Sequence, residues 1–167
     1  MIKLILAISL ILFEVCSFKV FLIGGALADN QTDVFTGLAA ATGKKPNPNK
    51  CGDDWKSTDC PKIAIVTSAA QSEAAGNEAY IVDLPNALSY KSLFTLYGFS
   101  PKHISVHIDN YRRTTDLNNI EGQLNLEILN QADVIYFNGG DQSRHSRSWL
   151  TDDGAYNQMM KAVAQRA

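Results

Sequence analysis

One stretch in the last quarter of the sequence combines residue types that could bind a reacting carbonyl group. A short apolar run, Val134–Phe137, is followed by Asn138, Gly139-Gly140, Asp141 and Gln142. Ligands of open α/β sheets bind at the carboxyl ends of parallel strands. Glycine lets the backbone approach a ligand, and free N–H groups there can stabilise an oxyanion. The stretch could therefore bind a reacting carbonyl, although two glycines alone are more typical of an ordinary strand-to-helix turn.

Charged side chains follow the same turn. Arg144 and Arg147 could bind an acidic part of a substrate, because a guanidinium pairs well with a carboxylate. The alternative is that both arginines lie on the solvated first turn of a helix. His145 lies beside them, and without a partner serine it cannot complete a catalytic triad, so we limit it to substrate contact. Trp149 is predicted to pack in the core.

The other residues able to do chemistry give weaker signals. Ser68 lies in Val66-Thr67-Ser68-Ala69-Ala70, which lacks the two glycines that a strained nucleophile turn requires, so we expect an ordinary residue at the end of a strand. His103 and His107 have the spacing of one strand face, which could suit a metal. No third ligand is evident, and we predict neither a metal nor a cofactor.

The first residues resemble a signal peptide. Lys3 is followed by an apolar run from Leu4 to Phe13, which is too short to span a bilayer as a stable helix. Cleavage after Ser17 would start the mature chain at Phe18. The alternative is a buried first strand, but residues 19–23 already account for one. We therefore expect a secreted, extracellular protein with no membrane attachment once residues 1–17 are removed.

The cysteines agree with export. Removal of residues 1–17 would leave only Cys51 and Cys60, which could form a disulfide in an oxidising compartment. Their spacing is not that of a zinc knuckle, so metal binding is the weaker alternative. The surrounding segment, about residues 43–61, is rich in Pro, Asn, Lys and Asp. We expect a surface insertion that contributes no core, and a tolerated insertion is favoured over a functional lid.

The charge balance excludes one class of partner. The formal net charge is −2 and stays so without the signal, because that segment contains one lysine and one glutamate. Nothing indicates nucleic-acid binding. The triplet Asn30-Gln31-Thr32 is a glycosylation acceptor pattern, but about one such triplet is expected by chance. The sequence leaves the oligomeric state open, including a homodimer.

Four short runs, apolar on both faces, are predicted to be parallel strands covered by helices. They are Lys19–Ile23, Lys62–Thr67, His103–His107 and Val134–Phe137.

Helical segments are expected between these strands. One is predicted from Asn77 to Tyr97, kinked or restarted at Pro85 and ended by Gly98, with most of its apolar residues on one stripe. Others are expected at about residues 117–130 and 154–166. Alternating strands and helices imply right-handed crossovers. The fold class is therefore α/β, with a parallel sheet covered by helices on both faces.

A family resemblance adds to this. The stretch Phe137-Asn138-Gly139-Gly140-Asp141-Gln142-Ser143-Arg144 resembles the Gly-Gly-Asp-Gln signature of cyanophycinase-like serine peptidases, within the wider aspartyl-dipeptidase-like group. Ile23-Gly24-Gly25-Ala26-Leu27 is similar to the opening turn of that family, and residues 80–98 are similar to its long helix. The resemblance spans residues 18–167, with the cysteine segment as an insertion. It implies a flavodoxin-like, class I glutamine amidotransferase-like domain that is incomplete at its C-terminal end.

The resemblance also implies an activity. The protein would hydrolyse an amide bond in an Asp-containing or β-linked peptide through an acyl-enzyme, with the nucleophilic serine beyond residue 167. The amides of Gly140 and Asp141 would form the oxyanion hole and Gln142 would position the scissile amide. Gly25, Arg144, His145 and Arg147 would contact the substrate. One alternative is a noncatalytic binding or matrix protein. A weaker one is a cysteine amidotransferase, although neither Cys51 nor Cys60 follows a strand.

Overall fold

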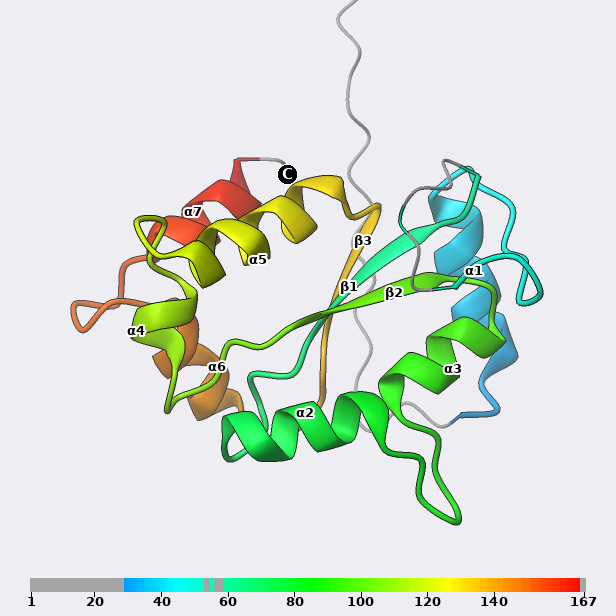
Figure 1. Cartoon of the computed structure of the whole chain (residues 1–167), viewed down its shortest axis with the longest axis horizontal. Coiled ribbons are helices and arrows are strands. Elements are labelled where there is room, and N and C mark those ends of the chain that lie inside the picture. Colours follow the sequence, from blue (N-terminus) through cyan, green and yellow to red (C-terminus); the bar gives the residue numbers. More distant parts are fainter. Residues whose placement is uncertain (1–28, 53–54, 56–58, 166–167) are drawn as a thin grey trace, which may run out of the picture.

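The computed structural model describes residues 29–52, 55 and 59–165 (Figure 1). The expected signal segment 1–17, its cleavage after Ser17, the strand Lys19–Ile23 and Gly25 lie outside the described residues.

The centre of the described fold is a sheet of three parallel strands, β1 (Lys62–Val66), β2 (Ser100–Ile104) and β3 (Val134–Phe137). Their order is β2-β1-β3, so two crossovers return the chain to either side of β1. The predictions for β1 and β3 are confirmed to within one residue. The prediction for β2 is wrong by three residues, because β2 begins before Pro101. Proline is tolerated there since β2 lies at one edge of the described sheet.

Seven helices lie around this sheet in the described part of the chain (Figure 1). Five have an N-cap side chain that accepts a hydrogen bond from the first turn, which satisfies one of the free amides there. The helices are α1 (Thr32–Ala41), α2 (Glu73–Ile81), α3 (Tyr90–Leu96), α4 (Tyr111–Thr114), α5 (Ile120–Gln131), α6 (Gln142–Trp149) and α7 (Gln158–Ala164).

Alternate residues of β1 face two separate cores. Ile63 and Ile65 pack in a cluster with aromatic residues of α1 and α3, whereas Ala64 and Val66 pack with residues of α5, α6 and α7. All four are fully buried. Because side chains of a strand alternate between its two faces, the burial of both sets means that helices cover both sides of the sheet. The predicted α/β class with a doubly covered parallel sheet is confirmed.

The segment predicted as one helix from Asn77 to Tyr97 is two helices, α2 and α3. The break surrounds Pro85, as expected, but the connection spans residues 82–89. Only Leu93 and Phe94 of the predicted apolar stripe reach the core. Leu84 and Leu96 are 60% and 56% exposed, so the single stripe is wrong. A loop in place of helical turns removes the 3.6-residue spacing that would have aligned these side chains.

The remaining helix predictions hold in outline. Helix α5 begins three residues later than expected and buries Leu129, but its Ile120 and Leu124 are 66% and 51% exposed rather than internal. Helix α7 begins four residues later than expected, because Asn157 caps its first turn. Helices α1 and α4 were not predicted.

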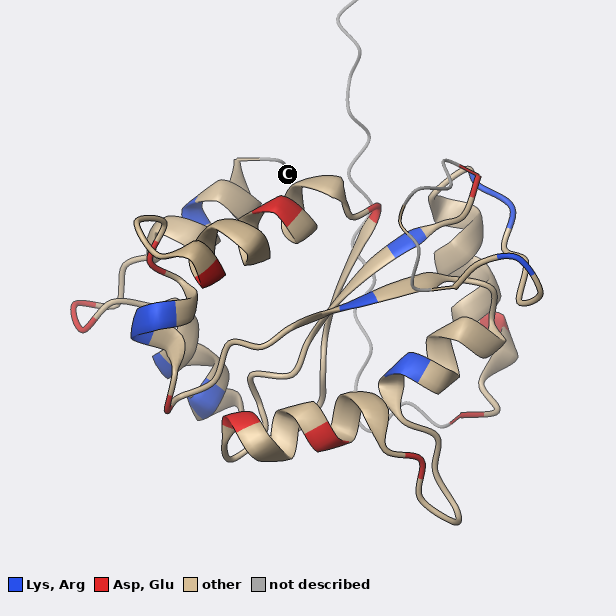
Figure 2. Cartoon of the chain, viewed as in Figure 1, with Lys and Arg blue, Asp and Glu red and all other residues tan. Residues whose placement is uncertain are grey.

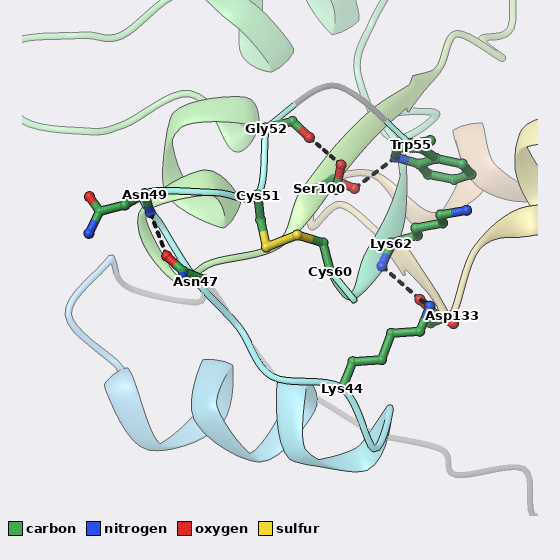
Figure 3. Close-up of a disulfide and its surroundings, with 10 residues drawn as sticks. All are labelled: Lys44, Asn47, Asn49, Cys51, Gly52, Trp55, Cys60, Lys62, Ser100 and Asp133. Atoms are coloured by element: carbon green, nitrogen blue, oxygen red, sulfur yellow. Dashed lines mark hydrogen bonds and ion pairs between the residues drawn. A yellow bond between two sulfur atoms is a disulfide. The ribbon is translucent and has the colours of Figure 1, made fainter. Parts of the chain in front are cut away.

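The segment at residues 43–61 is joined to the sheet more closely than the sequence suggested (Figure 3). Cys51 and Cys60 form the predicted disulfide and both are buried. Trp55 lies between them, and its indole N–H donates to the carbonyl oxygen of Ser100 at 2.9 Å. Trp55 is a member of one core cluster. The expectation that this segment contributes no core is therefore wrong. The segment is polar in composition, but its Trp55 side chain is buried in the core.

We expect replacement of both Cys51 and Cys60 by serine to lower the free energy of unfolding by about 2–3 kcal/mol, because the cross-link restricts the unfolded chain. The bridge joins residues nine positions apart. Urea denaturation followed by tryptophan fluorescence measures the effect. The reduced wild-type protein should match the double variant. Equal midpoints for oxidised protein and variant would show that the bridge contributes nothing.

Candidate functional site

The carboxyl ends of β1 and β3 form one continuous edge. The Asn138 N–H donates to the Val66 carbonyl at 2.9 Å, and the Asn138 side-chain oxygen accepts from the Ala69 N–H at 3.1 Å. Asn138 is buried, whereas residues 139–143 are exposed. The chain after β3 is thus fixed to the chain after β1 at its base and reaches solvent at the glycines.

The backbone N–H groups of residues 139–142 donate no hydrogen bond to any described residue. They follow one another at the exposed edge of the sheet, immediately before α6. These amides belong to Gly139, Gly140, Asp141 and Gln142, and the sequence predicted a role in the site for the last three. Free amides at a helix N-terminus and a strand end are suited to an oxyanion or a substrate carbonyl.

Asp141 has a structural part in this turn. Its carboxylate accepts from the Ser143 N–H at 2.9 Å and so caps α6. Hydrogen bonds from Ser143 hold the pKa of Asp141 below its usual value, helped by Arg144 and Arg147. Its side chain therefore stays ionised at neutral pH and is engaged with the helix, which leaves its backbone N–H as the group available to a ligand.

His145 connects the turn to the end of β1. Its Nε2 lies 2.9 Å from the Asn138 carbonyl oxygen, which can only accept, so Nε2 donates. Its Nδ1 hydrogen-bonds to the hydroxyl of Ser68. The indole N–H of Trp149 also donates to Ser68, at 2.9 Å. In the neutral ring, Nδ1 therefore accepts the Ser68 proton, and both nitrogens of His145 have partners within the protein.

The burial of Ser68 limits what Ser68 and His145 can do chemically. Ser68 and Trp149 are buried, with exposed fractions of 0% and 3%, so a substrate cannot reach the Ser68 hydroxyl in this conformation. The burial of Trp149 confirms its predicted packing role. Ser68 lies just after β1, as expected of a strand-end residue. Its hydrogen bonds with His145 and Trp149 hold α6 against the sheet.

The two arginines differ. Arg144 is half-buried and donates to the Ala69 carbonyl at 3.0 Å, with its Nε 3.5 Å from Asp141. Arg147 is exposed and has no hydrogen bond or ion pair to a described residue. Helix α4, with Arg112 and Arg113, packs against α6, and their basic residues lie near one another in Figure 2. Arg147 is thus the better placed of the two predicted arginines to bind a carboxylate.

Replacement of Gly140 by alanine should lower the free energy of unfolding by about 1–3 kcal/mol. Its φ of +140° is one that side chains rarely allow, and a Cβ would lie 2.9 Å from the Cβ of Ala69. Gly139→Ala is the control, because a Cβ there meets nothing within 4 Å. Equal chemical denaturation midpoints for the two variants would mean that the turn has another conformation.

A second polar cluster lies at the carboxyl ends of β1 and β2. The Thr67 hydroxyl is 2.7 Å from Nε2 of His103 and 2.9 Å from Nε2 of His107. The buried Nδ1 of His107 has no partner. A bare acceptor there avoids burying an unpaired N–H, so we assign the proton to its Nε2, which donates to Thr67, and Thr67 donates to His103. Among the described residues, no three His, Cys, Asp or Glu side chains converge as metal ligands.

One pocket in the described part of the chain lies away from the turn. It has a volume of about 490 Å³ and lies beside α4 and the start of α2, lined by Glu73 and residues 108–113. The turn at residues 139–142 is instead an open edge.

Sequence reasoning missed three contributors to the site. Asn138 was part of the recognised motif, but its double contact with the end of β1 depends on strand order, which the sequence does not state. Ser68 and Trp149 are brought to His145 from positions 77 residues before it and four after it. The helical i, i+4 spacing of His145 and Trp149 is the one signal that could have indicated their proximity.

Comparisons with known proteins found no match. No family model, no curated protein and no solved structure is significantly similar to this chain. In the described ranges, no helix is long and apolar enough to cross a bilayer.

Proposed function

We propose that this chain is the N-terminal part of a secreted serine peptidase that resembles the cyanophycinase-like family. It would cleave an amide bond in an Asp-containing or β-linked peptide through an acyl-enzyme. The fold would be of the flavodoxin-like, class I glutamine amidotransferase-like kind, and the nucleophilic serine would come from sequence beyond residue 167. The observation that carries the proposal is the run of amides at residues 139–142 that donate to no described residue.

The roles follow from the contacts around that run. The amides of Gly140 and Asp141 would stabilise the oxyanion, since preorganised N–H donors act most strongly where charge develops. Gln142 is exposed beside them and would hold the scissile amide. Arg147 would bind a substrate carboxylate. Arg144 and His145 are held by the protein, so we propose that they position the turn and contribute less to binding.

Export is supported by two independent features. The start of the sequence has the charge and apolar pattern of a signal peptide, and the chain contains a disulfide, Cys51–Cys60. Disulfides persist mainly in oxidising compartments. The proposed location is therefore extracellular.

A noncatalytic binding protein is the second candidate. It is favoured by the burial of Ser68, which is the one serine hydrogen-bonded to a histidine among the described residues. On this alternative, the free amides and Arg147 would bind a carboxylate or carbonyl ligand without turnover.

Hydrolysis of a β-aspartyl model peptide by the protein made from its complete coding sequence tests the proposal. We expect Gln142→Ala to lower kcat/KM by about ten- to hundredfold, the effect of losing one substrate hydrogen bond of about 1–3 kcal/mol. Gln131→Ala is the control, because Gln131 is an exposed glutamine at the end of α5, just before β3 begins. Saturable binding of the peptide without hydrolysis would favour the noncatalytic candidate.

A further inference from the structure

The sequence triplet Asn30-Gln31-Thr32 has a defined place in the structure. It forms the turn that leads into α1, and all three residues are exposed. The side chain of Asn30 makes no hydrogen bond to a described residue. The Thr32 hydroxyl contacts the Asn30 carbonyl oxygen at 3.4 Å. A bulky group attached to the Asn30 amide would therefore break no side-chain hydrogen bond to a described residue.

An exposed apolar loop lies next to this turn. Asp29 directly precedes Asn30, and its carboxylate accepts a hydrogen bond from the Leu88 N–H at 2.9 Å. Residues 81–88, Ile-Val-Asp-Leu-Pro-Asn-Ala-Leu, are all exposed and mostly apolar. Ile81 and Leu84 are each 60% exposed. We call residues 81–88 the apolar loop.

The apolar loop has a defined shape. Leu84 and Ala87 exchange backbone hydrogen bonds of 2.8 and 3.3 Å across its tip. At its base, Asp83 accepts from the Ser89 N–H at 2.7 Å and from the Ser92 hydroxyl at 3.0 Å. Because these bonds hold the loop outward, its apolar side chains cannot easily fold back onto the protein. Such a surface promotes association unless something covers it.

We propose that Asn30 carries an N-linked glycan that covers the apolar loop. In the transfer, Nδ2 of Asn30 bonds to the anomeric carbon of an oligosaccharide carried on a lipid diphosphate. The bond from that carbon to the diphosphate breaks, the lipid diphosphate leaves, and the amide loses one proton to the transferase. The reaction requires entry into a eukaryotic secretory pathway, so this inference rests on the proposed export and not on the proposed hydrolysis. The glycan is hydrophilic, and its attachment point, Asn30, directly follows Asp29, which contacts Leu88.

The first test is the mass of the protein secreted by eukaryotic cells. The complete chain is made with its own first 17 residues and, in parallel, with a leader known to direct secretion. We expect an oligosaccharide on Asn30 in the wild type and in Thr32→Ser, which keeps the acceptor pattern, and an unmodified Asn30 in Thr32→Ala. Peptide-N-glycosidase should remove it and convert Asn30 to aspartate. Secreted wild type with unmodified Asn30 overturns the proposal. Glycosylation only with the foreign leader would refute export by residues 1–17 and leave the site intact.

The second test asks whether the glycan covers the apolar loop. After enzymatic removal of the glycan, we expect self-association by light scattering, and Leu84→Ser should restore the monomer. Leu124→Ser is the control, because Leu124 is 51% exposed on α5, outside the apolar loop. If the deglycosylated protein stays monomeric, or if both leucine variants restore the monomer equally, the glycan does not cover the loop.

Discussion

Replacement of Gly76 by alanine is expected to lower the free energy of unfolding by about 3 kcal/mol. Gly76 is the buried residue of α2, and a Cβ there would lie 1.9 Å from Nε2 of His107. That ring is fully buried and bonded to Thr67 through the same nitrogen. The imidazole cannot move aside without breaking this hydrogen bond. In an unobstructed helix the same change would stabilise by about 1 kcal/mol, so the sign of the effect is diagnostic.

A double-mutant cycle isolates this contact. His107→Ala alone should destabilise, because it leaves a cavity and removes one of the two histidine partners of Thr67. Gly76→Ala added to His107→Ala should then be neutral or stabilising. Gly52→Ala is the control, since a Cβ there meets nothing within 4 Å. A destabilisation by Gly76→Ala of the same size with and without His107 would contradict the packing of α2 described above.

Acid is expected to destabilise the protein before its carboxylates are protonated. Burial, and secondarily the neighbouring His107, lowers the pKa of His103 from 6.5 to about 4. Burial also lowers the pKa of His107, against opposing effects of Asp109 and Glu73. The unfolded chain takes up protons below its histidine pKa of about 6.5, whereas the folded protein does not. The stabilisation that comes from the lowered pKa of His103 is therefore fully present above pH 6.5. As the pH falls towards 4, the free energy of unfolding decreases by about 2–3 kcal/mol because of His103.

Urea denaturation at a series of pH values measures this loss. His103→Gln keeps a hydrogen-bonding group near Thr67 but cannot titrate, so its stability should depend less on pH between 6.5 and 4. The pKa values of Asp83, Asp141 and Asp153 are lowered from 3.8. Their stabilisation is lost only at still lower pH. Equal pH profiles for wild type and His103→Gln would show that His103 is not the source.

The fold was predictable where the sequence has a short continuous apolar run. Strands β1 and β3 are short, apolar on both faces and bounded by polar residues, so hydrophobic pattern alone located them. Strand β2 contains Pro101 and two polar residues, Lys102 and His103, so its pattern is too mixed to fix its start. Helix α1 was not recognised, although Phe35 is fully buried, because its sequence follows the glycines of the expected first turn without a recognised helix start signal.

The candidate site was predictable only in its local part. The glycines, Asp141 and Gln142 are adjacent in sequence, and a strand-to-helix turn exposes their amides whatever the rest of the chain does. The supports of that turn come from elsewhere. Ser68 and Ala69 reach Asn138, Arg144 and His145 because β1 and β3 are neighbours. Strand order is a property of the whole fold, so no local pattern could reveal these contacts.

Amide NMR of ¹⁵N-labelled protein can show whether the N–H groups of residues 139–142 are free to bind a ligand. In the free protein these amides should exchange with solvent rapidly, whereas the Asn138 amide, bonded to Val66, should be protected. Titration with a β-aspartyl peptide should shift the Gly140 and Asp141 signals and slow their exchange. If these amides are already protected in the free protein and do not respond to the peptide, they are not the ligand-binding groups proposed.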